Sequence, residues 1–67
     1  MNCQEFTQKV HEQLIANGTI FNVLDGEEKI GQVGVIRTTI VYLEFNNSEI
    51  PNDILTGNYL FEMIEGE

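Results

Sequence analysis

The chain has 67 residues, with eleven acidic side chains against three basic ones and a formal net charge of −8. A chain this short has room for one domain, which buries only about 60% of the surface that the unfolded form exposes. Three cations neutralise too few phosphates for direct nucleic-acid binding, and anionic membrane surfaces repel an acidic chain. The charge balance therefore favours a basic protein as the partner.

Residues 3–16 are expected to form an amphipathic helix. Apolar side chains recur there at steps of three and four residues, so they would share one helical face. This stripe consists of Cys3, Phe6, Val10 and Leu14. Asn2 is a favourable N-cap with Glu5 three residues further on, and Asn17-Gly18 predicts a left-handed stop.

After the helix the apolar period changes to two, which predicts β-strands. Their expected bounds are residues 19–24, 29–36, 39–45 and 59–64. Asp25-Gly26-Glu27-Glu28 contains the Asp-Gly pair typical of a hairpin turn. Gly31 and Gly34 indicate a bulge or a close backbone approach. The junction at Arg37-Thr38 has no turn residue, so one long bent strand is the alternative to two strands.

The segment between the last two strands is predicted to be a loop. It begins at Asn46-Asn47-Ser48, and Pro51-Asn52-Asp53 favours a turn or a single helical turn through Leu55. Glu65-Gly66-Glu67 is expected to be a solvated end. The elements predict a single α+β domain over 1–67, with one N-terminal helix packed on a sheet of three or four mostly antiparallel strands.

Both faces of the strand predicted at 39–45 carry apolar side chains. One face would hold Val41, Leu43 and Phe45, and the other Ile40, Tyr42 and Glu44. If the first face lies beneath the helix, the second stays bare, because one helix cannot cover two faces. We therefore expect a homodimer, formed through the uncovered sheet face or by joining edge strands.

The chain offers few groups for nucleophilic or metal chemistry. Its one cysteine, one histidine and one serine are Cys3, His11 and Ser48. Cys3 and His11 lie about 12 Å apart along the predicted helix, so we expect Cys3 in the core and His11 at the surface. No disulfide, zinc site, calcium loop or phosphate loop is predicted, and no cofactor. A lone thiol and the lack of a signal-like start favour the cytoplasm.

The candidate partner-binding residues are carboxylates together with one aromatic side chain. They are Asp25, Glu27 and Glu28 in the hairpin turn, Tyr42, Glu44, Glu49 and Asp53 around the second loop, and Glu62 on the last strand. Duplex DNA carries one charge per ~1.7 Å of axis, so fixed carboxylates can occupy a groove that accepts phosphates. The second group is expected to dominate, because a strand holds Glu44 beside an aromatic anchor and a hairpin tip is more mobile.

In its size, acidity and lack of a catalytic motif, the chain resembles small phage and mobile-element proteins that inhibit host factors, some of which mimic DNA. The resemblance is one of type, and no motif carries it. It favours a non-enzymatic inhibitor of a nucleoid protein, a restriction or CRISPR nuclease, a repair enzyme or RNA polymerase. One alternative is a structural or adaptor module whose acidity only aids solubility. Another is an enzyme or enzyme subunit that uses its carboxylates.

Overall fold

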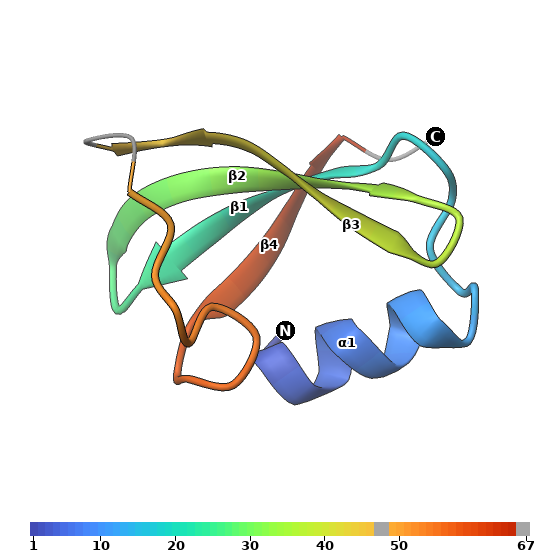
Figure 1. Ribbon diagram of the computed structural model, residues 1–67, viewed down its shortest axis with the longest axis horizontal. Helices are drawn as coiled ribbons and strands as arrows, with labels where there is room; N and C mark the ends of the chain where they lie inside the picture. Colours follow the sequence, from blue (N-terminus) through green and yellow to red (C-terminus); the bar gives the residue numbers. More distant parts are fainter. Residues whose placement is uncertain (47–48, 66–67) are drawn as a thin grey trace.

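The computed structural model describes residues 1–46 and 49–65 and shows one N-terminal helix packed on a four-stranded antiparallel sheet (Figure 1). The elements are α1 (Cys3–His11), β1 (Ile20–Asp25), β2 (Glu28–Ile36), β3 (Thr39–Phe45) and β4 (Leu60–Glu65). The strand order across the sheet is β3-β2-β1-β4. The predicted α+β class is confirmed, while the features expected at Asn47-Ser48 and Gly66-Glu67 lie outside the described residues. No helix in the described part is long and apolar enough to cross a membrane.

The start of α1 agrees with the prediction, and its apolar stripe forms the centre of the core. The Asn2 side chain accepts a hydrogen bond from the Glu5 amide at 2.8 Å, so Asn2 is the N-cap. The Phe6 ring stacks on that of Phe61 with centroids 4.2 Å apart. The same ring meets Phe21 edge-on at 5.0 Å. Three aromatic rings from α1, β4 and β1 thus fix the helix on the sheet.

The predicted end of the helix at Asn17-Gly18 is wrong, because α1 ends at His11. Gln13 adopts a left-handed φ of 59°, and its amide donates to the Val10 carbonyl at 3.1 Å. The Leu14 amide donates at 2.9 Å to a carbonyl five residues back. These two bonds form a Schellman motif, in which glutamine takes the place usually held by glycine. Leu14 therefore leaves the apolar stripe and is 65% exposed.

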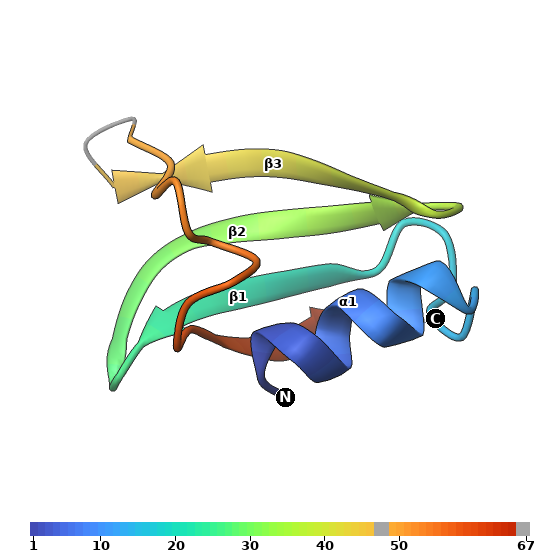
Figure 2. The same ribbon diagram turned by 60° about the horizontal axis from the view of Figure 1, so that its bottom comes forward.

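A loop completes the cover of the sheet face that α1 leaves partly open. Figure 2 shows the chain after β3 crossing the strands on the same side as the helix. Ile54 of this loop is buried in the core. The Cys3 thiol donates to the Ile54 carbonyl at 3.2 Å, so the loop is fastened to the first turn of α1.

Both hairpin turns are two residues long. Asp25 pairs with Glu28 across Gly26-Glu27, and Gly26 has the positive φ of 68° that this predicted turn requires. The junction between the next two strands is also a turn, so two strands are correct there rather than one bent strand. Arg37 adopts a φ of 57° at this turn, and its amide donates to the Asn17 side chain.

The register of β3 corrects the predicted faces of that strand. Between its pairings with Phe45 and Tyr42, β2 advances two residues whereas β3 advances three. This bulge puts Phe45 and Tyr42 on the face that α1 covers, with ring centroids 6.2 Å apart. The expected grouping of Phe45 with Val41 and Leu43 is wrong, because those two lie on the opposite face with Gly34.

That opposite face carries neither the helix nor the loop (Figure 1). Its centre is polar, because the Gln32 side-chain amide donates to that of Asn22 at 3.3 Å across β2 and β1. Exposed apolar side chains flank this pair, among them Leu43 on β3 and Ile36 on β2. The amide pair makes the bare face less apolar than a second core face would be.

Candidate partner-binding site: an acidic hollow

Two acidic segments that are distant in the chain meet at one end of the sheet. A hollow of about 650 Å³ lies between the β1–β2 turn and the loop that follows β3. Three of its lining residues are carboxylates: Asp25, Glu28 and Glu49. Among the described residues, none that lines this acidic hollow is a lysine, arginine or histidine. The hollow therefore presents negative charge from two separate segments.

The β1–β2 hairpin forces two of these carboxylates together. Asp25 and Glu28 are the last pair of the ladder and lie directly opposite each other on one face of the sheet. Like charges in directly opposed positions destabilise a sheet. Glu27 at the tip of the turn is also exposed, so three of the four turn residues are acidic. The turn thus concentrates charge at a cost in stability.

The other wall of the hollow is held by hydrogen bonds from the loop. The Asn46 side chain donates to the Lys29 carbonyl at 2.9 Å, which fixes the start of the loop against β2. The Tyr59 hydroxyl donates to Asp53 at 3.1 Å. Partial burial, the hydrogen bond to Asp53 and the nearby charges of Asp53 and Asp25 raise the pKa of Tyr59 above its usual value of 10.0. Carboxylates of both acidic segments therefore contribute to the raised pKa of Tyr59.

A tight turn sets the position of Asp53. The amides of Thr56 and Gly57 donate to the Asp53 carbonyl at 3.0 and 2.6 Å. A Cβ added at Gly57 would lie 2.7 Å from a carboxylate oxygen of Asp53. Glycine at this position leaves room for the carboxylate to turn toward Tyr59. Asp53 borders the hollow through Tyr59 and is not one of its lining residues.

The cations of the chain lie away from the hollow. Lys29 pairs with Leu24, one step from the acidic pair, so its side chain lies on the opposite sheet face. Lys9 is in the last turn of α1, and Arg37 is in the β2–β3 turn. Figure 1 shows these two segments at the end of the molecule opposite the β1–β2 turn. The molecule therefore has an acidic end and a less acidic end.

Five of the eight predicted site residues do not line the hollow. Glu27 lies in the turn between two lining residues, Asp53 borders the hollow through Tyr59, and the other three lie elsewhere. Glu44 is exposed on β3, and Tyr42 packs beside Phe45 with 37% of its surface exposed. Glu62 is exposed on β4, where it pairs with Asn22 of β1. The structure thus joins the hairpin group to Glu49 and Asp53. Sequence reasoning missed Tyr59, whose signal was an aromatic residue directly after the Thr-Gly-Asn turn at the start of a strand.

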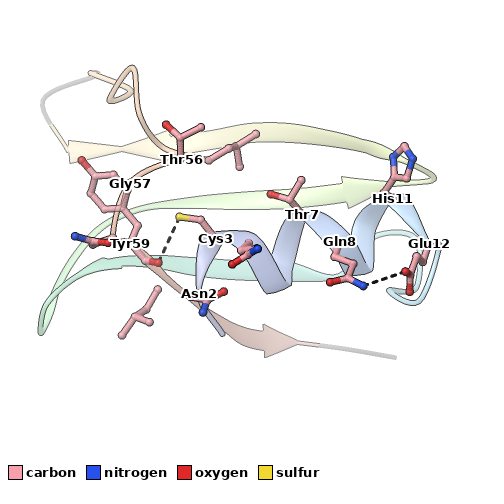
Figure 3. Close-up of a pocket in the computed structure, with 13 residues that line it drawn as sticks. Asn2, Cys3, Thr7, Gln8, His11, Glu12, Thr56, Gly57 and Tyr59 are labelled. Carbon is pink, nitrogen blue, oxygen red and sulfur yellow. Dashed lines mark hydrogen bonds between the residues drawn. The ribbon is translucent and has the colours of Figure 1, made fainter.

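A second hollow of about 980 Å³ lies between α1 and residues 55–60 (Figure 3). Cys3 lines it, but this thiol is 3% exposed and donates to the carbonyls of Ile54 and Tyr59 at 3.2 and 3.4 Å. The expected core position of Cys3 is confirmed. His11 is exposed, as expected, and lies at the other end of the helix. Ser48 lies outside the described residues.

Over residues 1–46 and 49–65, no three His, Cys, Asp or Glu side chains are grouped closely enough to hold a metal ion. The carboxylates of the hollow are spread around an open surface, which suits lysine and arginine side chains of a partner.

Comparison with known proteins finds no matching family model, curated protein or solved structure. The geometry of the hollow therefore carries the functional argument.

Proposed function

We propose that the protein is a non-enzymatic, cytoplasmic binding protein that occludes the basic nucleic-acid-binding surface of another protein. The acidic hollow supports this proposal. Its hairpin opposes Asp25 and Glu28 although this pairing costs stability, and Glu49 faces them from another segment. Solubility requires only dispersed charge. It does not explain carboxylates that converge where they repel one another.

The mechanism is electrostatic steering followed by competitive exclusion. The acidic end draws a basic groove toward the hollow and orients the encounter. Arginine side chains that hold phosphates can hold carboxylates in the same bidentate way, so bound carboxylates exclude nucleic acid. The class of target is a nucleoid protein, a nuclease, a repair enzyme or RNA polymerase. A phage or mobile-element origin fits an inhibitor of such a host protein.

A dimerisation or adaptor module is the second candidate, and the open edge of the sheet favours it. β3 lies at the edge of the sheet with exposed apolar side chains on both faces. Exposed edge strands pair readily with other strands. We propose a homodimer in solution under either candidate function. Salt separates the two, because an apolar edge contact depends on ionic strength far less than a contact between charges does.

Charge reversal at the hollow tests the leading proposal. One variant carries Asp25→Lys, Glu28→Lys and Glu49→Lys. Its matched control carries Glu5→Lys, Glu12→Lys and Glu62→Lys, which makes the same charge change at exposed positions outside the hollow. Calorimetric titration against a panel of purified DNA-binding proteins measures affinity, with a competing DNA duplex and a salt series.

We expect the hollow variant to lose at least about tenfold in affinity, equal to about 1.4 kcal/mol, and the control to lose much less. Wild-type binding should weaken as salt rises and should be displaced by DNA. Circular dichroism checks that both variants fold. Equal binding by the two variants, together with little effect of salt, would contradict the proposal and favour the adaptor role.

A further inference from the structure

The two edges of the sheet differ in how they are covered. At the β4 edge, the Met1 amino group donates a hydrogen bond to the Phe61 carbonyl at 2.9 Å. The Phe61 amide donates back to the Met1 carbonyl at 2.7 Å, and Asn2 forms a bridge with Leu60. In the described part of the chain, β3 has β2 on one side and no strand on the other. β3 is therefore an open edge along its length, whereas Met1 and Asn2 cover β4 at Leu60 and Phe61 only.

The hydrogen bonds of β2 show which backbone groups of β3 are free. The Val35 amide donates to the Thr19 carbonyl at 3.1 Å, and its own carbonyl accepts from the Gly18 amide at 2.7 Å. Val35 thus directs both backbone groups toward β1. Backbone groups alternate in direction along a strand, so Gly34 directs its groups toward β3.

This alternation continues across to β3. Val41 pairs with Gly34, so the Val41 backbone groups bond back into the sheet. Ile40 and Tyr42, on either side of it, must direct their amide and carbonyl groups outward. Two residues at the open edge therefore offer a donor and an acceptor each, separated by one residue whose groups are already used.

We propose that a second copy of this chain pairs with the edge, β3 against β3, antiparallel about a two-fold axis through Val41. Ile40 of each copy then lies opposite Tyr42 of the other, and all four outward donors and all four acceptors on the two copies find partners. If the register moves by two residues in one direction, Tyr42 lies opposite Thr38. If it moves by two residues in the other direction, Ile40 lies opposite Glu44. The pairing joins the two sheets into one of eight strands. The inference rests on the homodimer proposed above and is independent of the acidic hollow.

Charge identifies a second copy as the occupant. Two chains of −8 repel each other over most of their surfaces, but β3 is uncharged from Thr39 to Leu43. Arg37 precedes this segment and Glu44 follows it. In this antiparallel register Glu44 of each copy lies opposite Thr38 of the other, the residue next to Arg37 in the chain, so opposite charges approach each other at both ends. Each acidic end also comes to lie along the less acidic end of its partner.

The pairing also covers apolar side chains on both faces of the strand. Leu43 is 48% exposed on the uncovered face and lies opposite Thr39 of the second copy. On the other face, the half-exposed Tyr42 lies against Ile40 of the second copy. Cross-strand pairs of this kind each stabilise an antiparallel sheet by about 0.2–1 kcal/mol.

Cysteine cross-linking tests the register. In a Val41→Cys variant the two new thiols form a non-hydrogen-bonded pair with Cα atoms about 4.5 Å apart, within the range of a disulfide. Thr39→Cys is the control. Each Thr39 lies opposite Leu43 of the other copy, so the two cysteines are four residues, or about 13 Å, apart along the strand. The native Cys3 is buried and stays out of the reaction. We expect the Val41→Cys dimer to form at least about ten times faster under mild oxidation, judged by non-reducing electrophoresis.

Sedimentation equilibrium tests the dimer itself. The wild type should show twice the monomer mass at micromolar concentration. Val41→Lys should be monomeric, because two ammonium groups meet at the axis, whereas Leu14→Lys at an exposed site elsewhere should remain dimeric. Tyr42→Pro removes an outward amide without breaking a bond to β2 and should also be monomeric.

A monomeric wild type would overturn both the dimer and this interface. A wild-type dimer whose Val41→Cys variant cross-links no faster than Thr39→Cys would overturn the interface alone and assign the dimer to the uncovered sheet face. If Tyr42→Pro does not fold, the Val41→Lys comparison still decides. Lysine variants of the acidic hollow should remain dimeric, so a failure of the binding proposal is distinguished from a failure of this one.

Discussion

Replacing Gly31 by alanine tests the packing that sets the register of β3. A Cβ at this position would come 2.5–2.6 Å from the Phe45 Cγ and Cε2 atoms, so the ring must move by about 1 Å to restore ordinary contact. Overpacking of this kind typically costs about 1–3 kcal/mol. Reduced freedom of the unfolded chain offsets about 0.4–1 kcal/mol of that cost. The expected net loss is therefore about 1–2 kcal/mol.

This loss is large for a chain of 67 residues. Domains have about 0.05–0.15 kcal/mol of stability per residue, which gives about 3–10 kcal/mol here. One kcal/mol shifts the melting temperature of so small a domain by about 4–8 °C. The Gly31→Ala variant should therefore melt about 5–15 °C below the wild type, measured by circular dichroism at one fixed protein concentration, because a dimer melts in a concentration-dependent way.

Gly34→Ala is the matched control on the same strand. The nearest atoms to its added Cβ are Leu43 Cδ1 at 3.6 Å and the Thr19 carbonyl oxygen at 3.9 Å, which are ordinary contacts. Its stability should stay within about 0.5 kcal/mol of the wild type. Adding Phe45→Leu to Gly31→Ala should cost less than the two single changes summed, since the smaller side chain makes room. Equal melting of the two alanine variants would refute the account of the Phe45 contact.

The remaining predictions concern single groups. Gln13→Gly should stabilise the fold by about 0.5–1 kcal/mol by relieving the left-handed φ, whereas Gln8→Gly within α1 should cost about as much in urea unfolding. Asn2→Ala should cost about 1 kcal/mol by removing the N-cap bond. Asp53→Asn should lower the raised pKa of Tyr59, seen in the ultraviolet titration of tyrosinate. Because the folded protein holds the Tyr59 proton more tightly, this contribution to stability is complete below pH 10.0 and is lost as the pH rises through the folded pKa.

Local signals in the sequence were sufficient for the class of fold and for most elements. The N-cap at Asn2, the Asp-Gly turn and the change of period after the helix each depend on residues close together in the chain. The end of α1 could not be predicted in this way. Gln13 has no intrinsic preference for a left-handed φ, and Asn17-Gly18 offered a stronger stop signal only a few residues further on.

The faces of β3 depend on a partner strand that the local pattern does not contain. Tyr42 to Phe45 alternates in the sequence as a regular strand does, so period two assigned these residues to opposite faces. The bulge places the Phe45 ring over Gly31 on β2, where the absence of a side chain leaves space for it. Of the predicted bulge or close backbone approach at Gly31, the bulge is present, in the pairing with β3, but nothing in the sequence indicated that the Phe45 side chain would lie over this glycine.

For the site, the sequence identified the carboxylates but not their arrangement. Asp25 and Glu28 were adjacent through a predicted turn, so their meeting followed from local structure. Glu49 joins them only because the loop after β3 turns back over the sheet, held by Asn46. Tyr59 joins them because β4, which begins at the next residue, pairs with β1. Long-range chain paths of this kind depend on core packing, here on the burial of Ile54 of the loop, which local turn signals do not indicate.

The proposed dimer and the acidic hollow together would limit how the protein engages the proposed target. Antiparallel pairing at the β3 edge turns the two acidic ends in opposite directions, so the two hollows cannot form one continuous acidic strip. Under both proposals each hollow would bind its own basic surface, with one partner molecule for each protomer. The monomeric Val41→Lys variant should therefore keep wild-type affinity for a small basic partner and bind it one to one in calorimetry. A clear loss of affinity in that monomer would show that the partner contacts both copies, and the hollow alone would not account for binding.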